Sequence, residues 1–277
     1  MLIVMGEIVL LVDFMYLWNR IYYAVGHDGG DYYTHMKSIM EKLNNNNKYA
    51  KKYVILDGLN GTQRQKALLP EYKEGRGSKT EVYKQVKRFV KECSQEFTSL
   101  VFLRANNNEA DEVIASLAVK FSRLEKEVYI YSGDKDLLQL LVYPRVHVGM
   151  SYSGNFGLKP FTEEEIQKKM DTVAGAGRLS NIGDLLKFRV FRGDVSDNIS
   201  PVISRFPSKV IIDLITHTWP EVTMLTEDIF ESMVKYLPEK YSKQLIENEE
   251  KLWRNWELMN LQFLPINDII SEVKRLS

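Results

Sequence analysis

The alternation of apolar and polar segments along the first 160 residues predicts an α/β fold. Short apolar runs typical of buried strands, such as IVLLVD and YVIL, are separated by longer segments with apolar positions at helical spacing. Strands are expected at Glu7–Asp13, Lys52–Asp57, Leu100–Arg104, Glu127–Tyr131 and Arg145–Gly149. Helices are expected at Phe14–Ala24, Tyr33–Leu43, Glu109–Phe121 and Lys135–Leu141. Strands that alternate with helices form a mostly parallel sheet covered on both faces.

The pattern changes near Pro160. From Thr162 onward the apolar positions follow helical spacing in one segment after another, among them FTEEEIQKKM and INDIISEVKRL. Just before the change, Gly154–Phe161 is expected to add a short edge strand. The sequence therefore predicts an α/β domain over residues 1–160 and a helical region over residues 161–277.

The connection Gly61–Ser99, between the second and third predicted strands, is long and basic. Between Thr62 and Lys91 there are nine Lys or Arg residues and three Glu residues, although the chain as a whole has no net charge. Its second half, Thr80–Gln95, has the pattern of an amphipathic helix. Residues 61–99 therefore form either a solvated surface helix with an irregular lead-in or an arm that grips phosphates.

Composition excludes several classes of protein. A single cysteine, Cys93, rules out an intrachain disulfide and fits a reducing compartment. The apolar start MLIVMGEIVLLVDF lacks a basic segment and a cleavage site, so it is expected to be a buried strand rather than a signal peptide. No run reaches the roughly 20 apolar residues of a membrane span. A cytoplasmic protein without membrane contact is expected.

Eight acidic residues recur where predicted strands give way to loops or helices. They are Asp13, Asp57, Glu109, Asp111, Asp134, Asp136, Asp194 and Asp197. Because parallel strands direct their carboxyl ends to one edge of a sheet, those that follow strands are expected to converge. Like charges at short distance raise each other's pKa, so such a cluster needs cations. Hard divalent cations that prefer oxygen ligands, Mg²⁺ or Mn²⁺, fit this need.

Each acidic pair also has an explanation without metal, because acidic and small polar residues cap helices. The capping candidates are Asn108 with Glu109, Asp111 and Glu112; Ser132 or Asp134; and Asp194 with Asp197. Capping does not explain two acids, Asp134 and Asp136, directly after one buried strand. Nor does it explain Asp13 and Asp57 at the ends of two further strands. Taken together, the acids favour a metal site.

Other sites for metals and phosphates are excluded by spacing. The four histidines, His27, His35, His147 and His217, lack the spacing of zinc ligands. The segment GRGSKT has no glycine directly before its lysine, and no strand leads into it, so it is not a phosphate-binding P-loop.

The ordered motifs LLVDF, ILDG, LPEYKEGR, EADE, YSGDKDLLQL and FRGDVSDN resemble those of the 5′-nucleases. This family comprises flap endonucleases, the 5′→3′ exonuclease domains of bacterial DNA polymerases, and bacteriophage RNase H-type enzymes. The resemblance runs from Ile8 to Ile215, and the phage members are the most similar because the chain ends after a short helical tail. It implies a PIN-like fold with a helix–three-turn–helix element in the helical C-terminal region.

The resemblance also implies two metal sites that hold Mg²⁺, for which Mn²⁺ substitutes. The implied ligands of the first site, directly or through water, are Asp13, Asp57, Glu109, Asp111 and Asp134. Those of the second site are Asp136, Asp194 and Asp197, with Asp134 near both. Glu112 stands where the family often has Asp, and its role is left open.

Residues of the basic arm match the family's gateway, which threads a single-stranded 5′ end. The resemblance implies that Lys73 and Arg76 contact the scissile phosphate and act in catalysis with Asp134. Tyr72 would stack on a base. Arg64 and Lys66 are expected to contribute further DNA contacts.

One segment departs from the family pattern. The family's turn after GDxSDN is rich in glycine and binds duplex phosphates and a monovalent cation such as K⁺. Here the turn reads SPVISRFPSKV, in which the glycines are missing and Pro207 has no N–H to donate. Arg205 and Lys209 are expected to bind phosphate by charge instead.

The resemblance implies a monomeric Mg²⁺-dependent 5′-nuclease of phage DNA replication, working in the host bacterial cytoplasm. Its substrates would be 5′ flaps, other branched DNA, and RNA primers in RNA–DNA duplex, with a single-strand binding protein as a partner. Two alternatives stay open: a single-strand RNase of the PIN type, and a non-catalytic protein that binds DNA junctions.

Overall fold

The computed structural model describes residues 7–26, 31–75, 80–153, 157–175, 177–219 and 224–276. Its contacts divide the chain into two compact units. The first contains Met1–Gln63, Gly77–Phe161 and Leu264–Ser277, and the second contains Arg64–Arg76 and Thr162–Phe263. The change of unit at Phe161 falls beside the expected boundary near Pro160. The three other crossings, after Gln63, after Arg76 and before Leu264, have no counterpart in the sequence pattern.

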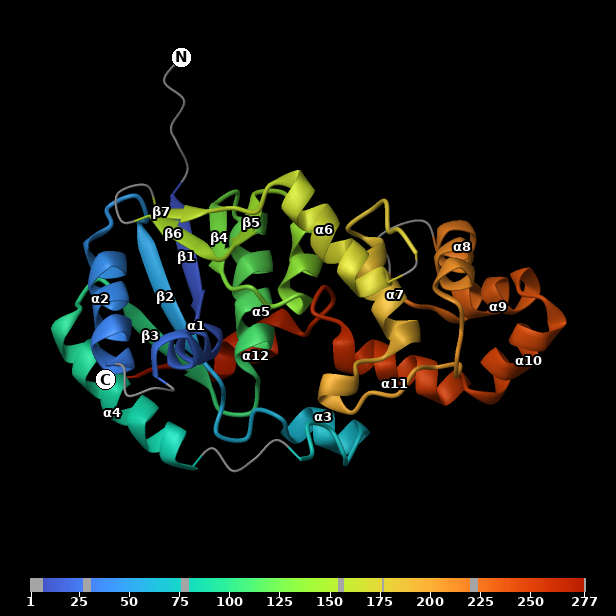
Figure 1. Cartoon of the computed structure of the whole chain (residues 1–277), viewed down its shortest axis with the longest axis horizontal. Helices are drawn as coiled ribbons and strands as arrows, with labels where there is room; N and C mark the ends of the chain where they lie inside the picture. The colour runs from blue at the N-terminus through green and yellow to red at the C-terminus, as the bar shows by residue number, and fades with distance from the viewer. Residues whose placement is uncertain are drawn as a thin grey trace, which may run out of the picture. The chain divides into compact units, whose positions relative to one another are not determined.

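A six-stranded sheet forms the centre of the first unit, with the strand order β5-β4-β1-β2-β3-β8 (Figure 1). The strands are β1 Ile8–Asp13, β2 Lys51–Leu56, β3 Val101–Ala105, β4 Glu127–Tyr131, β5 Val146–Gly149 and β8 Val273–Arg275. All neighbouring strands are parallel except β3 and β8. The prediction of a mostly parallel sheet is confirmed, and the five predicted strands agree with the observed ones within one residue at each end.

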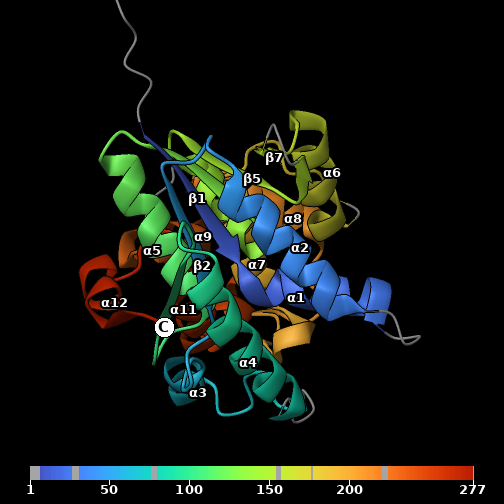
Figure 2. The ribbon, with the colours of Figure 1, turned by 90° about the vertical axis from the view of Figure 1, so that its left-hand side faces the viewer.

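Alternating side chains of the central strands enter two separate apolar layers. Leu10, Val12 and Val54 pack against Phe14 and Trp18 in one buried cluster. Val9 and Leu11 are fully buried as well, and since successive strand residues point to opposite faces, they lie on the other side. Figure 2 shows α5 and α12 on one side of the sheet and α1, α2 and α4 on the other. Both faces are covered, which explains why the strand segments are almost continuously apolar.

The helices of the first unit follow the predicted order with local differences. They are α1 Phe14–Ile21, η1 Tyr22–Gly26, α2 Tyr32–Asn45, α4 Thr80–Glu96, α5 Ala110–Arg123, η2 Asp136–Val142 and α12 Ile266–Glu272. The expected helix Phe14–Ala24 changes to a π-helix at Tyr22. The expected α-helix Lys135–Leu141 is a 3₁₀ helix. The amphipathic helix expected in the arm is confirmed as α4.

Two expectations about the edges of the sheet are wrong. The edge strand expected at Gly154–Phe161 is β7 (Gly157–Lys159), which pairs with β6 (Ser151–Ser153) in a separate two-stranded sheet. The chain end, expected to be helical, returns as β8, which pairs antiparallel with β3. A three-residue strand is set by the open edge of β3 rather than by a local pattern, so the sequence does not reveal it.

The second unit is helical. Its helices are α3 Gln63–Leu68, of which Gln63 belongs to the first unit, and α6 Glu163–Ala174, α7 Asp184–Arg192, η3 Val195–Asp197, α8 Ser208–Thr218, α9 Glu227–Tyr236, α10 Glu239–Glu247 and α11 Glu249–Met259. Its core contains the ring pair Trp219–Trp256, with centroids 5.1 Å apart, and Phe191 beside Phe206. The helical C-terminal region is confirmed, whereas α3 was not expected. Among the described helices, none combines the length and apolar character needed to cross a membrane.

Candidate functional site

Strand register brings several of the predicted ligands to one edge of the sheet. Asp13 is the last residue of β1 and lies opposite Ile55 of β2, two residues before Asp57. On the other side, Val12 lies opposite Tyr131, the last residue of β4, so the β4 strand ends beside Asp13 and continues toward Asp134. The three carboxylates therefore follow three adjacent parallel strands at their carboxyl ends. The parallel register thus places the carboxyl ends of these strands side by side, while a shared metal site stays a prediction.

Asp13 is the buried centre of this edge. Asp13 is 8% exposed, and it accepts hydrogen bonds from the Tyr16 backbone N–H at 3.0 Å and from the Ser132 hydroxyl at 2.9 Å. The first bond makes Asp13 the N-cap of α1, so the expectation that helix capping does not explain this residue is wrong. The pKa of Asp13 is raised to about 7: burial is the largest cause and the charges of Asp57 and Asp134 add to it, while the two hydrogen bonds lower the pKa. A cation beside Asp13 would therefore stabilise its ionised form.

The loop after β2 fixes Asp57 against the start of α5. Asp57 Oδ1 accepts from the Ala110 backbone N–H at 3.0 Å, and Gly58 N–H donates to the Asn108 carbonyl at 2.9 Å. A Cβ on Gly58 would stand 2.3 Å from the Ala105 carbonyl oxygen, so only glycine allows this approach. The backbone of these two segments holds Asp57 in place without help from a metal.

Glu109 and Glu112 form the cap of α5. Glu109 is the N-cap residue, and Glu112 Oε2 accepts from its backbone N–H at 3.1 Å and from Asn108 Nδ2 at 3.3 Å. The expectation that Asn108 is the cap is wrong by one residue. Glu112 is 1% exposed, and this capping box accounts for its side chain. Asp111, in the first turn, accepts from the Glu112 backbone N–H at 2.7 Å.

A chain of hydrogen bonds links the end of β4 to Asp13. The Ser132 hydroxyl donates to Asp13 and accepts from the Asp134 backbone N–H at 3.1 Å. Asp134 Oδ1 in turn accepts from the Asp136 backbone N–H at 2.9 Å. Asp134 is exposed and Asp136 half-buried. The serine thus sets the spacing between the buried and the exposed carboxylate.

These residues fit a divalent cation by their chemistry. They offer only oxygen atoms, and their most buried member is an acid whose pKa is raised by its surroundings and by two neighbouring acids. Within the described residues, no three Asp, Glu, His or Cys side chains stand close enough to hold an ion as they are placed. Side-chain rotation at the edge would therefore accompany metal binding.

Asp194 and Asp197 lie in the second unit, on the loop around η3. Asp194 is the N-cap of η3, accepts from Ser196 and pairs with Arg189 at 2.6 Å. Burial alone would raise the pKa of Asp194, but the Ser196 hydrogen bonds and the Arg189 charge hold it below its usual value. Asp194 therefore stays ionised without a metal. The assignment of both acids to a second metal stays a prediction.

The first residues of the basic arm pack against the same loop. Tyr72 is a buried residue, 4% exposed, and its hydroxyl lies 3.5 Å from Asp197 Oδ2. Lys73 Nζ lies 3.9 Å from the same oxygen and 4.9 Å from the centre of the Tyr72 ring. A ring buried in this way offers no face to a base, so the expected stacking by Tyr72 does not fit this conformation. Arg76 lies outside the described residues.

The other predicted DNA-binding residues also lie in the second unit. Arg64 Nη1 donates to the Glu257 carbonyl at 3.4 Å, while Lys66 is exposed. Arg205 is exposed on the turn before α8, and Lys209 is exposed in the first turn of that helix. Arg205 has φ +55°, the left-handed conformation that glycine adopts most easily, so the turn forms without the expected glycine. Phosphate binding by these four residues stays a prediction.

Comparison with known proteins identifies the family. The profile described as "5′-3′ exonuclease, N-terminal resolvase-like domain" matches residues 8–171. The chain belongs to the 5′-3′ exonuclease family. The resemblance inferred from the motifs is thereby confirmed.

Relatives of this exonuclease-family chain include proteins of similar and of much greater length. Flap endonuclease Xni of Shewanella sp. (strain W3-18-1) is 27% identical over 270 residues, 93% of this chain and 91% of that protein. The 5′-3′ exonuclease of Buchnera aphidicola is 31% identical over 62% of this chain and 55% of its own length. DNA polymerase I of Chloroflexus aurantiacus is 32% identical over 137 residues, which is 49% of this chain but only 14% of the polymerase.

Solved structures share the fold. The T5 5′-exonuclease with bound divalent metal ions (zinc) superposes with a TM-score of 0.69 at 20% identity, covering 96% of this chain and 93% of that one. A complex of the bacteriophage T5 D15 flap endonuclease with DNA and metal ions gives a TM-score of 0.67 at 18% identity, with the same coverage. At this identity the likeness establishes the fold of the exonuclease-family chain.

Several residues that shape the site escaped the sequence analysis. Arg189 pairs with Asp194, although a single Arg carries no signal in a sequence. Ser132 was expected only as a helix cap, whereas it joins two carboxylates. Asn255 is fully buried in α11, and its Nδ2 donates to the carbonyls of Val190 and Ser200 on either side of the Asp194 loop. An Asn within the apolar pattern of a helix was the one available hint.

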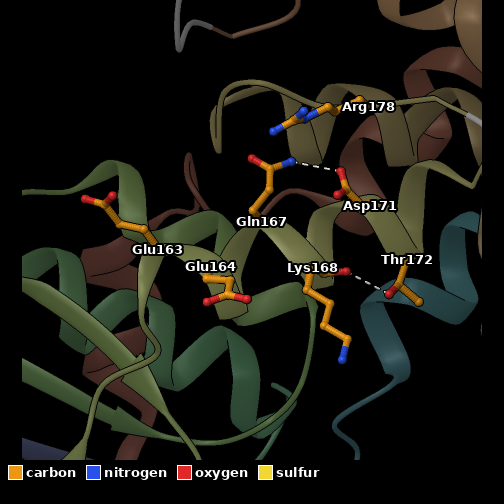
Figure 3. Close-up of a pocket in the computed structure, with 7 residues that line it drawn as sticks. All are labelled: Glu163, Glu164, Gln167, Lys168, Asp171, Thr172 and Arg178. Atoms are coloured by element: carbon orange, nitrogen blue, oxygen red, sulfur yellow. Dashed lines mark hydrogen bonds between the residues drawn. The ribbon is translucent and has the colours of Figure 1, made fainter.

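A shallow cavity of about 780 Å³ lies along α6, and none of its lining residues is a predicted site residue (Figure 3). It is lined by Glu163, Glu164, Gln167, Lys168, Asp171, Thr172 and Arg178. Gln167 Nε2 donates to Asp171 at 2.8 Å and to the Leu179 carbonyl at 2.9 Å. These bonds join α6 to the segment that follows it, so they have a structural role.

The buried Asp13 predicts an unusual effect on stability. Its pKa rises from 3.8 to about 7 on folding, so the folded state keeps a proton that the unfolded chain loses. The free energy of unfolding of the metal-free protein should therefore fall as pH rises from about 4 to about 7. Asp13→Asn removes this cost, because its amide oxygen can still accept from the Tyr16 N–H and its NH2 group can donate to the Ser132 hydroxyl. At pH 8 the free energy of unfolding of the variant should be higher than that of the wild type by on the order of a few kcal/mol. Urea denaturation in EDTA measures this difference. A less stable variant at pH 8 would contradict the account.

Proposed function

We propose that this exonuclease-family chain is a Mg²⁺-dependent 5′-nuclease that cleaves 5′ flaps and removes RNA primers during phage DNA replication. The observation that carries the proposal is the edge where the buried Asp13 meets Asp57 and Asp134 after three parallel strands. Ionising three acids at one sheet edge, one of them buried, costs free energy because of burial and like-charge repulsion, and a bound divalent cation offsets this cost. Asp13 also caps α1 and Asp57 accepts from the first N–H of α5, but neither hydrogen bond requires a buried acid whose pKa is raised.

Each acidic residue has a distinct task in this proposal. Asp13, Asp57 and Asp134 hold the first ion, and Glu109 and Asp111 bind it directly or through water. Asp136, Asp194 and Asp197 stay the predicted ligands of a second ion. Two bound ions would supply an activated water and stabilise the leaving oxygen. The residues Ser132 and Ala110 keep the carboxylates of Asp13 and Asp57 in position through hydrogen bonds.

The substrate class is proposed from the basic residues and from relatives. Lys73 and Arg76 bind the scissile phosphate and stabilise the charge that develops on it. Arg64, Lys66, Arg205 and Lys209 bind phosphates of the flanking DNA. Similarity to flap endonuclease Xni and to DNA polymerase I supports action on branched DNA in replication. A donor set of oxygen atoms fits a hard divalent cation such as Mg²⁺, for which Mn²⁺ can substitute.

A panel of end-labelled substrates tests the proposal against its alternatives. In Mg²⁺, a 5′ flap and a primer RNA annealed to DNA should both be cut near the single-strand–duplex junction, leaving a 5′-phosphate. Preferential cutting of single-stranded RNA would favour a PIN-type RNase. Tight binding of the flap without cleavage in Mg²⁺ or Mn²⁺ would favour a junction-binding protein. The same panel in EDTA serves as the control.

Metal binding should also stabilise the fold. A ligand that binds only the folded state raises its stability by about 2.7 kcal/mol at 100 times its Kd. Saturating Mg²⁺ or Mn²⁺ should raise the Tm of the wild type relative to EDTA by several degrees, measured by differential scanning fluorimetry. Asp13→Asn should lose most of this shift. An equal metal-induced shift in both proteins would contradict the assignment of Asp13 as a ligand.

A further inference from the structure

Asn198 makes a double contact with the beginning of the basic arm. Its side-chain nitrogen Nδ2 donates to the Glu71 carbonyl at 2.8 Å and to the Glu74 carbonyl at 3.0 Å. Lys73 lies between these two carbonyls, and its own backbone N–H donates to the Asp197 carbonyl at 3.1 Å. All of these residues belong to the second unit. Three hydrogen bonds therefore hold the backbone around Lys73 to the loop that carries Asp197.

The contact stabilises a backbone conformation that Lys73 would rarely adopt by itself. Lys73 has φ +54°, in the left-handed region that side chains other than glycine rarely occupy. A neighbouring structure must hold such a residue in place. The carbonyls of Glu71 and Glu74 on either side are the points at which Asn198 does so. With them fixed, Lys73 Nζ lies 3.9 Å from Asp197 Oδ2.

Asparagine suits position 198 for two physical reasons. The residue has φ +61° and ψ +24°, a conformation that Asn tolerates better than most residues. Its amide also supplies two N–H donors, one for each carbonyl. Aspartate would keep the shape and the backbone tolerance but would offer only acceptors. Glycine would keep the backbone and lose the side chain.

We propose that Asn198 is a positioning residue that holds Lys73 of the arm to the Asp194–Ile199 loop, so that the reactive lysine and the acidic loop move as one body. The inference rests on the proposed function for the role of Lys73. It adds a residue with no part in metal or phosphate binding whose loss should slow cleavage through Lys73 alone.

Two variants test the donor function. Asn198→Asp and Asn198→Gly should each lower the single-turnover rate on a saturating 5′-flap substrate at least about tenfold, since small misplacements of a catalytic group have effects of this size or larger. The Kd for the same flap, measured in EDTA, should stay within about twofold of the wild type. Asn248→Asp is the matched control, because it removes a single side-chain donor to the Gln244 carbonyl elsewhere in the second unit. A loss in Asn198→Asp alone would point to added charge and overturn the proposal.

A double-mutant cycle separates positioning from general damage. In the Lys73→Ala background, Asn198→Asp should have little further effect, because the residue acts through Lys73. If the fold-losses in cleavage rate of the two single variants multiply in the double variant, Asn198 acts independently of Lys73, and the proposal is overturned.

Hydrogen exchange gives a result that does not depend on cleavage. The amides of Lys73 and Glu74 donate to Asp197 and Glu71, so the peptide covering residues 71–75 should be protected in the wild type. Asn198→Asp and Asn198→Gly should exchange this peptide at least about tenfold faster, with the rest of the second unit unchanged. Equal exchange in the wild type and both variants overturns the positioning contact. A wild type that exchanges as expected but does not cleave flaps contradicts the proposed function instead.

Discussion

Asp134→Asn should lower the single-turnover rate of flap cleavage at least about 1,000-fold, which corresponds to about 4 kcal/mol of transition-state stabilisation. Asp134 follows the strand next to Asp13, and it is the exposed member of the Asp13–Ser132–Asp134 chain. The substitution keeps the acceptor for the Asp136 N–H and removes one negative charge. Metal affinity should fall with that charge, while DNA binding by the basic residues should hardly change.

The Asp134→Asn experiment has a matched control in the same unit. Asp268→Asn removes an exposed acid from the first turn of α12 in the same unit and should cleave like the wild type. Rapid-quench measurement at saturating Mg²⁺ compares the three proteins, and fluorescence anisotropy in EDTA compares their binding of the flap. Wild-type cleavage by Asp134→Asn in Mg²⁺ would refute the role of the carboxylate edge.

Lys73→Ala should lower the single-turnover rate about 100-fold, because removal of one group that stabilises transition-state charge has effects of this order. The ammonium group of Lys73 is held near Asp197, with the side chain 17% exposed, so it is already ordered before substrate arrives. Order of this kind reduces the entropic cost of placing the charge at a phosphate. The binding of the flap should weaken far less than the rate falls.

Lys235→Ala is the matched control for Lys73→Ala. Lys235 is a largely exposed lysine of the second unit whose recorded ion pair, with Glu231, lies on the surface of α9. The expected rate is that of the wild type, since exposed pairs of this type contribute little. If Lys73→Ala kept the wild-type rate and only its Kd rose, Lys73 would bind DNA without acting in catalysis.

Much of the first unit was predictable because its strands are buried on both faces. A strand buried on both faces, such as IVLLVD, forms an almost continuous apolar run that is recognisable in the sequence, and an acid at the end of that run is easily identified. Because the strands are parallel, the acids at their carboxyl ends are predicted to lie at one edge of the sheet. The placement of Asp13 beside the residues that follow β2 and β4 was therefore within reach of the sequence.

The contacts that tune the site were not predictable from local pattern. The hydroxyl of Ser132 and the guanidinium of Arg189 matter only because the fold brings a carboxylate to each of them. The burial of Tyr72 against Asp197 likewise depends on a residue 125 positions away. The strand β8 forms because β3 has an open edge, a property of the assembled sheet. Such long-range contacts leave no period or motif in the chain.

Glu112 is a helix-capping residue of α5. Its sequence position suggested either a metal ligand or a helix cap, and the structure shows the carboxylate buried and bonded to the Glu109 and Asn108 nitrogens. Glu112 is therefore part of the frame that presents Glu109 and Asp111. A change at this position would act first on the stability of α5.

The most direct test of the account is the dependence of wild-type cleavage on Mg²⁺ with a 5′-flap substrate labelled at its 5′ end. The account predicts no cleavage in EDTA, a single-turnover rate that rises to saturation with Mg²⁺, and a released flap cut near the junction, with a 5′-phosphate on the remaining strand. Undiminished cleavage in EDTA, or no cleavage at any concentration of Mg²⁺ or Mn²⁺, would contradict it.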